Sequence, residues 1–177
     1  MSKNKYNGKM RPSAGQNPRG KVSQKSLAII SVCAIILGIF ITAQEYLDRH
    51  TLAASAAEAT VTETLAEVVK TIPAYAQSMT AGSSEADALT DAADTFATGS
   101  FREKIEAYRD VSDILEKHSS DQAAPAKALR EAMSTVEDAA VAYNKEAQAL
   151  NEKIVKFPYN IVAKLGGYAE FPIFVLN

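Results

Sequence analysis

The fold of this chain is decided by the stretch LREAMSTVEDAAVAYNKEAQALNEKIVKF, residues 129–157. Alternating steps of four and three separate its apolar residues, which are Leu129, Met133, Val136, Ala140, Tyr143, Ala147, Leu150, Ile154 and Phe157. An average step of 3.5 residues places them along one side of a long α-helix. Because a helix with one narrow apolar seam gains little by standing alone in water, it must pack against a partner of similar length. The stretch therefore predicts a helical bundle.

A second apolar seam precedes it, within residues 44–79. One set of residues recurs every seven positions, and a second set interleaves with it: Leu47, Ala54, Val61, Val68 and Tyr75, then Leu65, Ile72 and Met79. No Gly or Pro separates this seam from the apolar run before it, so we expect one continuous helix. Pro73 lies inside that helix, and because proline removes the hydrogen bond to the carbonyl of Val69, we expect a helix bend there.

The region between the two seams, residues 85–118, is less regular. Its apolar residues fall on two different sides: Leu89, Ala93, Phe96 and Ala97 on one, and Phe101, Ile105, Tyr108 and Leu115 on the other. Gly99 separates the two groups, and Ser100 with Glu103 has the spacing of a capping box. We therefore predict an all-α fold: an N-terminal transmembrane helix that continues into an antiparallel up-down bundle. The bundle has three long helices, or four if the second is broken near Gly99.

Residues 27–43, LAIISVCAIILGIFITA, carry no charge. As a helix they span roughly 26 Å, close to the ~30 Å thickness of the bilayer hydrocarbon. Tyr46 follows where an interfacial aromatic residue belongs. A cleaved signal peptide is the competing interpretation, but Ile41-Thr42-Ala43 is a poor cleavage site. We expect an uncleaved transmembrane anchor.

The first 26 residues carry seven basic and no acidic side chains, whereas the rest of the chain carries the other 12 basic and all 21 acidic ones. With little to bury, residues 1–26 are expected to form a disordered basic arm. Binding to nucleic acid or to anionic lipid is conceivable, but a topology signal explains the arm most simply. The charge bias then places the N-terminus in the cytoplasm and the bundle, residues 44–157, outside a cell membrane crossed once.

No residue pattern points to catalysis. His50 and His118 lie far apart, and neither has the Glu-x-x-His partner of a di-metal bundle, so we expect both to be solvated surface residues. Cys33 is the one cysteine and lies in the apolar run. There is no glycine-rich phosphate loop and no nucleophile–base pair. Asp87, Asp91 and Asp94 share one helix side, which we interpret as a solvated acidic face. We expect no enzyme, no metal and no cofactor.

Asn144 and Asn151 form the most specific polar pair. Each directly follows a seam residue, and the two are seven positions apart, so they face the same way. They could fix the alignment of helices or recognise a partner. The interpretation that we favour is structural, with hydrogen bonds to the C-terminal tail or to a neighbouring helix. That tail, residues 158–177, is apolar and aromatic, and should pack on the bundle, on lipid or in a partner's groove. We expect packing on the bundle.

A C-terminal motif, which we take as a candidate interaction or structural site, contains Tyr143, Asn144, Asn151, Phe157, Pro158 and Asn160. The anchor, the Ile72-Pro73 pair and this motif together resemble the LemA family of bacterial membrane proteins. The resemblance implies a single-pass anchor and an antiparallel four-helix bundle, in a family without an established biochemical role. The chain departs from the family pattern before the Ile-Pro pair and at Ala74, which stands in place of an asparagine. The family has been described with its N-terminus outside, and the charges here predict the opposite.

We therefore expect a membrane-anchored, non-enzymatic scaffold or interaction protein of the LemA type. Its partners would be the lipid bilayer and another membrane or cell-envelope protein, such as a protease or signalling complex. No nucleic acid is expected, and a homo-oligomer is compatible with the pattern. The alternative is an extracytoplasmic sensor or ligand-binding bundle, in which the bend at Pro73 relays a shift to the bilayer.

Overall fold

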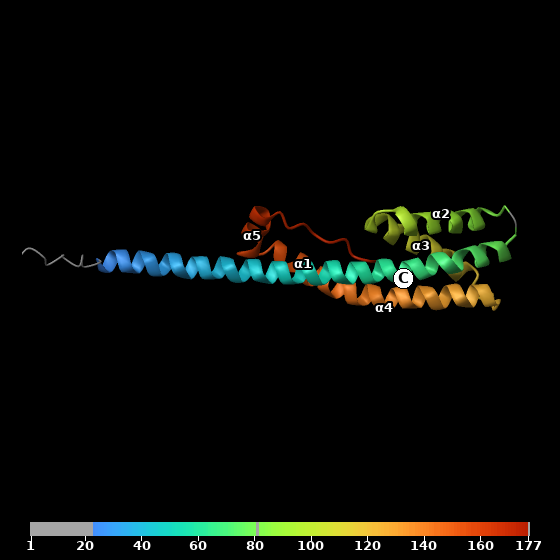
Figure 1. Ribbon diagram of the computed structural model, residues 1–177, viewed down its shortest axis with the longest axis horizontal. Coiled ribbons are helices and arrows are strands. Elements are labelled where there is room, and N and C mark those ends of the chain that lie inside the picture. The colour runs from blue at the N-terminus through green and yellow to red at the C-terminus, as the bar shows by residue number, and fades with distance from the viewer. Residues whose placement is uncertain (1–22, 81, 177) are drawn as a thin grey trace, which may run out of the picture. The chain divides into compact units, whose positions relative to one another are not determined.

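The structure, a computed structural model, describes residues 23–80 and 82–176. Over these residues it is helical, without a β-strand (Figure 1). The helices are α1 (Gln24–Ser78), α2 (Ser84–Thr98), α3 (Phe101–Lys117), α4 (Ala124–Ile154) and α5 (Tyr159–Gly166). The predicted all-α fold class is confirmed.

The predicted basic arm lies almost entirely outside the described residues. Its end is an exception, because α1 begins at Gln24, so residues 24–26 are helical and do not belong to an irregular arm. The correction follows from the sequence, since Gln24, Lys25 and Ser26 contain no helix-breaking residue before the apolar run.

The chain divides into two compact units, residues 1–36 and residues 37–177. In the first unit, the part of α1 that the structure describes is apolar. Its large side chains, such as Leu27, Ile30 and Ile35, are exposed. In the described part of the chain, α1 is the one helix long and apolar enough to cross a membrane. It runs without interruption from Gln24 through the predicted anchor to Ser78, which confirms the continuous helix. The helix includes Pro73, and the bend there stays a prediction.

The second unit contains one main hydrophobic core, to which α1, α2, α3 and α4 all contribute. Both predicted seams are buried, with two exceptions at their ends: Met79 is only partly buried, and Phe157 is exposed. The buried heptad residues explain why these helices form, because each gains its stability by burying one apolar side against the others.

Of the two alternatives left open for this region, the break near Gly99 is present, since α2 ends at Thr98 and α3 begins at Phe101. The capping box is formed as expected: the backbone N–H of Ser100 donates to the Glu103 carboxylate at 2.7 Å, and the Glu103 N–H donates to the Ser100 hydroxyl at 3.4 Å. A Cβ on Gly99 would lie 2.7 Å from the Thr95 carbonyl oxygen, so only glycine fits this close turn. The assignment of Ala97 to an apolar side of this region was wrong, because Ala97 is exposed.

The end of α4 also differs from the prediction. The helix stops at Ile154, one turn before Phe157, whose side chain is 73% exposed instead of closing the seam. The reason is Pro158, which disfavours a helical conformation in the preceding residue and cannot donate a backbone hydrogen bond. The Phe157–Pro158 peptide bond is cis.

The C-terminal tail begins with a helix that the sequence analysis did not predict. This helix, α5, follows Pro158 and ends at Gly166, and Gly167 caps it with a positive φ of 73°. Its residues Val162 and Ala163 pack with Ala43 and Leu47 of α1 and with the last turns of α4, forming the smaller hydrophobic cluster. The remaining residues, 168–176, which we call the terminal segment, lie without regular secondary structure along the helices (Figure 1).

Candidate functional site

Asn144 and Asn151 on α4 hold the terminal segment through its backbone. The Asn144 side-chain amide donates to the carbonyl oxygen of Phe174 at 2.7 Å, and its oxygen accepts from the Phe174 N–H at 2.8 Å. Asn151 makes the same two hydrogen bonds with Phe171, at 2.8 and 2.9 Å. Each carboxamide therefore pairs with one backbone residue through both its donor and its acceptor. We call this pair of interactions the asparagine clamp.

The spacing of the clamp follows from elementary geometry. Two asparagines seven residues apart on a helix are separated by about 10.5 Å along its axis. Three residues of extended chain cover about 10 Å, and Phe171 and Phe174 are three residues apart. The terminal segment can thus satisfy both carboxamides in phase only when it is nearly fully extended. A one-residue slip on either side would break the register.

Phe174 fills the space that the clamp closes. Its side chain is 1% exposed, and its ring contacts the edge of Tyr108, with 4.8 Å between the ring centroids. Phe101 lies beside it at 6.3 Å and packs edge-on against Tyr143 at 4.9 Å. These rings come from α3, α4 and the terminal segment, so the clamp fixes a shared aromatic core.

Two tyrosines complete the site with hydrogen bonds. The Tyr143 hydroxyl donates to the carbonyl oxygen of Pro172 at 2.5 Å, and the Tyr108 hydroxyl donates to the Glu137 carboxylate at 3.0 Å. Burial raises the pKa of Tyr143, helped by the negative charge of Glu58. Burial also raises the pKa of Tyr108, with the hydrogen bond to Glu137 as the second cause. Both phenols therefore stay protonated and keep donating at neutral pH.

A pocket of about 550 Å³ lies between the terminal segment, α1 and the start of α3. Thr51 and Glu58 of α1 and Phe101 are among its lining residues, and residues 166–172 form its remaining wall. The Thr51 hydroxyl is buried and has no hydrogen-bond partner among the described residues. Burial raises the pKa of Glu58, partly offset by the positive charge of Lys104. The pocket therefore combines an apolar wall with two polar groups that a ligand could satisfy.

The six predicted motif residues do not meet at one point. Tyr143, Asn144 and Asn151 come together on the terminal segment, whereas Phe157, Pro158 and Asn160 lie at the turn into α5. The Asn160 side-chain oxygen is buried without a hydrogen-bond partner in residues 23–80 and 82–176.

The expectation of a solvated side chain was wrong for His50, whereas the His118 side chain is 41% exposed. The His50 ring nitrogen Nδ1 lies 2.9 Å from the Glu146 carboxylate, with the side chain only 16% exposed, and the ring stacks on Tyr46. His118 pairs with Glu85 at 2.8 Å. The paired residues are 96 and 33 positions apart, and a single-sequence pattern cannot show such contacts.

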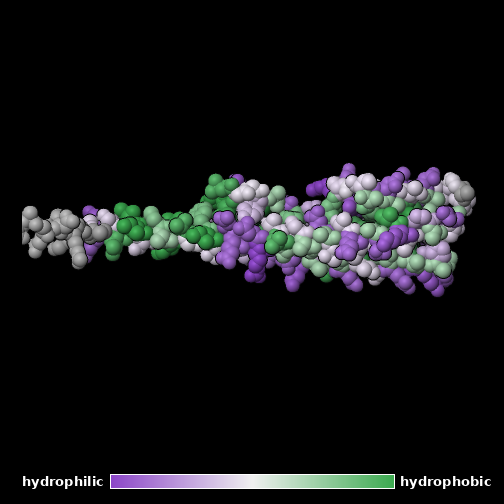
Figure 2. Space-filling model, in the orientation of Figure 1, coloured by the Kyte–Doolittle hydropathy of each residue, from purple (hydrophilic) through white to green (hydrophobic). Residues whose placement is uncertain are grey.

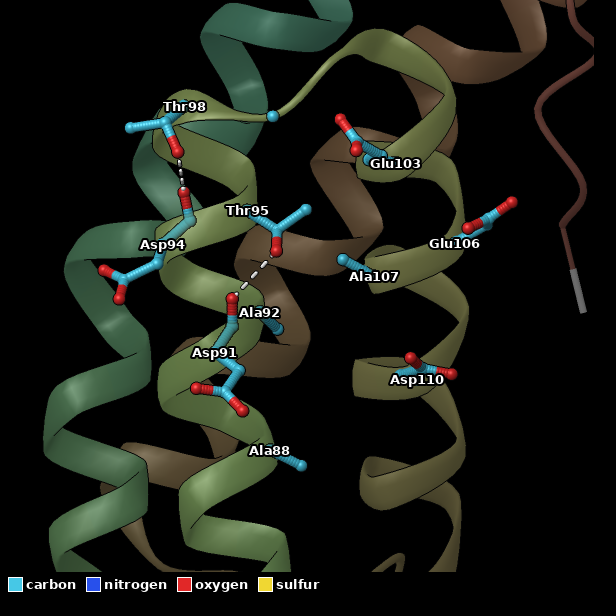
Figure 3. Close-up of a pocket in the computed structure, with 11 residues that line it drawn as sticks. Ala88, Asp91, Ala92, Asp94, Thr95, Thr98, Glu103, Glu106, Ala107 and Asp110 are labelled. Carbon is cyan, nitrogen blue, oxygen red and sulfur yellow. Dashed lines mark hydrogen bonds between the residues drawn. The ribbon is translucent and has the colours of Figure 1, made fainter.

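The acidic face of α2 borders an open groove against α3, shown in Figure 3. Alanines line its facing sides, while the carboxylates of Asp94 and Glu106 point away from the gap in opposite directions. The carboxylates thus do not converge on a common point. No group of three or more His, Cys, Asp or Glu within the described ranges could hold a metal ion.

Sequence reasoning identified both asparagines but missed their partners, Phe171 and Phe174. The available signal was the match between a seven-residue helical spacing and a three-residue extended spacing. Comparison with known protein families, with curated proteins and with solved structures finds no match for this chain.

Proposed function

We propose that this chain is a membrane-anchored, non-enzymatic scaffold of the LemA type, which presents a helical domain to another cell-envelope protein. In this proposal residues 27–43 of α1 span the membrane once. The exposed apolar side chains of α1, which include Leu27, Ile30 and Ile35, support the span, because water does not favour them and lipid does. The basic residues before the span support a cytoplasmic N-terminus.

The proposal includes the antiparallel up-down arrangement of the bundle. Contacts between α1 and α4 support it, because Tyr46 faces Lys153 and His50 pairs with Glu146, so rising numbers on α1 meet falling numbers on α4. The pair of Glu85 and His118 supports an antiparallel α2–α3 hairpin in the same way, since it joins the start of one helix to the end of the next. Short connections favour antiparallel neighbours.

The asparagine clamp is the observation that carries the scaffold proposal. The most specific polar residues of the bundle bind the protein's own backbone, and they close the aromatic core around Phe174. Such a clamp supplies shape and rigidity, which a binding surface needs. Polar groups used for catalysis would instead have to face a substrate.

Crosslinking in intact cells tests this proposal. We would compare the wild-type chain, the Asn144→Ala/Asn151→Ala double variant and a Gln148→Ala control, which changes an exposed α4 residue between the clamp positions. We expect the same defined envelope protein to be crosslinked to the wild type and the control, and much less to the double variant. Equal recovery from all three chains, or recovery from none, would contradict the proposal.

Cysteine accessibility tests the proposed orientation. A Cys33→Ser chain that carries Val141→Cys, an exposed position on α4, should react in intact cells with a maleimide that cannot cross membranes. Reaction only after the cells are opened would place the helical domain in the cytoplasm and refute the orientation.

The pocket below the terminal segment favours the alternative function, a ligand-binding or sensor domain. The buried Thr51 hydroxyl and the Glu58 carboxyl offer polar groups to a small molecule with an apolar body. We would screen the full chain in detergent micelles against classes of small metabolites and measure the melting temperature. A ligand of this pocket should raise the melting temperature of the wild type and of Thr60→Val, an exposed control, and have less effect on Thr51→Val. No shift with any class would count against this function.

A further inference from the structure

The turn into α5 and the outer side of α5 expose an unusual number of large apolar side chains. Phe157, just before the helix, is 73% exposed, and Ile161 and Leu165, which lie four residues apart on one side of α5, are 39% and 81% exposed. Val155, just before them, is exposed as well. We call these four residues the outer patch. Figure 2 shows hydrophobic atoms gathered over α5.

The opposite side of α5 is apolar too. Val162 and Ala163 are buried against α1 and the end of α4 in the smaller hydrophobic cluster. A short helix that exposes large apolar side chains beside its buried apolar side favours an apolar environment for both. Protein covers one side of α5, and no described residue covers Phe157 or Leu165. An exposed apolar group of this kind marks an interaction surface.

The contacts of α5 with α1 show where the outer patch lies along α1. Its buried side contacts Ala43, the last residue of the predicted span, and Leu47, one turn beyond. Phe40, which lies inside the predicted span, packs against the same cluster. The outer patch is therefore fixed at the level where α1 leaves the hydrocarbon, provided that α1 spans the membrane as proposed.

The lysines and tyrosines of this region fit a lipid surface. From residue 153 to residue 169 the chain has three basic side chains, Lys153, Lys156 and Lys164, and no acidic one. Lysines at this depth can reach anionic headgroups while their stems cover apolar surface. Tyr46 and Tyr159 pack edge-on, with 5.3 Å between their centroids, and the Lys153 ammonium lies 5.7 and 5.6 Å from the two rings. Tyrosines of this kind are enriched at membrane interfaces.

We propose that α5 is an interfacial membrane helix, whose outer patch inserts into the headgroup boundary of the same bilayer that α1 spans. This inference deepens the proposed function and rests on its membrane anchor. The lipid contact would make α5 a second attachment point, so the asparagine-clamped terminal segment would begin at the membrane surface. The packing of α5 against Phe40 and Ala43, at the end of the span, argues for lipid over a protein partner.

Depth-dependent quenching tests the inference on the full chain. Single cysteines would be placed in a Cys33→Ser chain at Leu165, at Ile35 in the span and at Val141 on α4, all three exposed. Each variant would be labelled with an environment-sensitive fluorophore and reconstituted in phosphatidylcholine–phosphatidylglycerol vesicles. Lipids carrying a nitroxide at the headgroup or deep in the acyl chain would serve as quenchers.

We expect the label at Leu165 to be blue-shifted and to lose fluorescence mainly to headgroup nitroxides. The label at Ile35 should lose it to deep nitroxides, and the label at Val141, about 20 Å from the end of α4 along the helix axis, should keep its fluorescence. A label at Leu165 that behaves like the one at Val141, while Ile35 is quenched, overturns the inference and leaves the anchor intact. An unquenched Ile35 label refutes the anchor itself, and the inference falls with it.

A second labelled position controls for a local effect of the label at Leu165. Phe157→Cys in the same chain lies on the outer patch, outside any helix, so the substitution removes no buried side chain. The inference requires that a label there is quenched by headgroup nitroxides as well. Quenching at Leu165 alone would contradict insertion of the patch as a unit.

Discussion

Removal of the asparagine clamp should release the terminal segment while the helices stay folded. The perturbation is Asn144→Ala combined with Asn151→Ala, which deletes four hydrogen bonds between 2.7 and 2.9 Å long. The clamp connects α4 only to the terminal segment, so the apolar seams of α1 and α4 are untouched. Gln148→Ala on the exposed side of α4 is the matched control.

The magnitude follows from the hydrogen bonds of each clamp position. A partly buried hydrogen bond contributes about 1 kcal/mol net, so each asparagine stabilises the bound segment by about 2 kcal/mol. A loss of about 2 kcal/mol corresponds to a roughly 30-fold increase in the open population of the segment. The two losses share one bound segment, so the double variant should show coupling between the sites instead of simple addition.

Hydrogen–deuterium exchange measures this opening amide by amide. In Asn144→Ala, the Phe174 N–H loses its acceptor and must exchange faster for that reason alone. The informative amide is Phe171, which keeps its bond to Asn151. If the segment opens as one unit, we expect the Phe171 amide to exchange about 30-fold faster in Asn144→Ala as well.

An isosteric variant separates hydrogen bonding from packing. Asn144→Asp keeps the acceptor for the Phe174 N–H but, when ionised, sets a carboxylate oxygen against the Phe174 carbonyl oxygen. Protonation near pH 4 and below restores a donor, so terminal-segment binding should be weak at neutral pH and recover in acid. A spin label at Val175→Cys in a Cys33→Ser chain would report it. Unchanged Phe171 exchange in the alanine variants, or no acid recovery in the aspartate variant, would refute the reasoning.

Two further predictions concern the core and the α3 cap. Phe174→Ala should lower the free energy of unfolding by about 3–5 kcal/mol because it empties a buried site, whereas Val175→Ala should change it little; thermal unfolding in detergent micelles measures both. The hydrogen bonds from the Ser100 side chain and backbone lower the pKa of Glu103 from its usual 4.5, so the folded state favours the ionised form. This stabilisation is present above pH 4.5 and is lost as the pH falls through the lowered pKa. Glu103→Gln should therefore flatten the acid side of a plot of melting temperature against pH.

The helices themselves could be predicted because their apolar spacing is a local property. Val61, Val68 and Tyr75 recur every seven residues, and any partner that buries one of them buries them all. The continuity of α1 and the capping box after Gly99 were local as well, since the first needs only the absence of helix breakers and the second two residues at a fixed spacing. These predictions needed no knowledge of what each seam faces.

Of the predictions that failed, one needed information from outside its own segment and one did not. His50 was expected in solvent because nothing near it in sequence pairs with it, yet Glu146, 96 residues away, does. Phe157 continued the periodic seam, but Pro158 ended the helix first and the side chain turned outward. In the first case a tertiary contact decided the outcome, whereas in the second the neighbouring proline was already visible in the sequence.

The sequence alone thus determined an all-α chain with an apolar N-terminal helix, because helical periodicity and hydrophobicity are written in neighbouring residues. Only the tertiary structure decided what Asn144 and Asn151 bind. Their partners are the backbone groups of Phe171 and Phe174, and backbone groups are the same in every residue, so no side-chain pattern identifies them. The pairing depends on the path by which α5 returns the chain to α4, and that path is set by packing against α1.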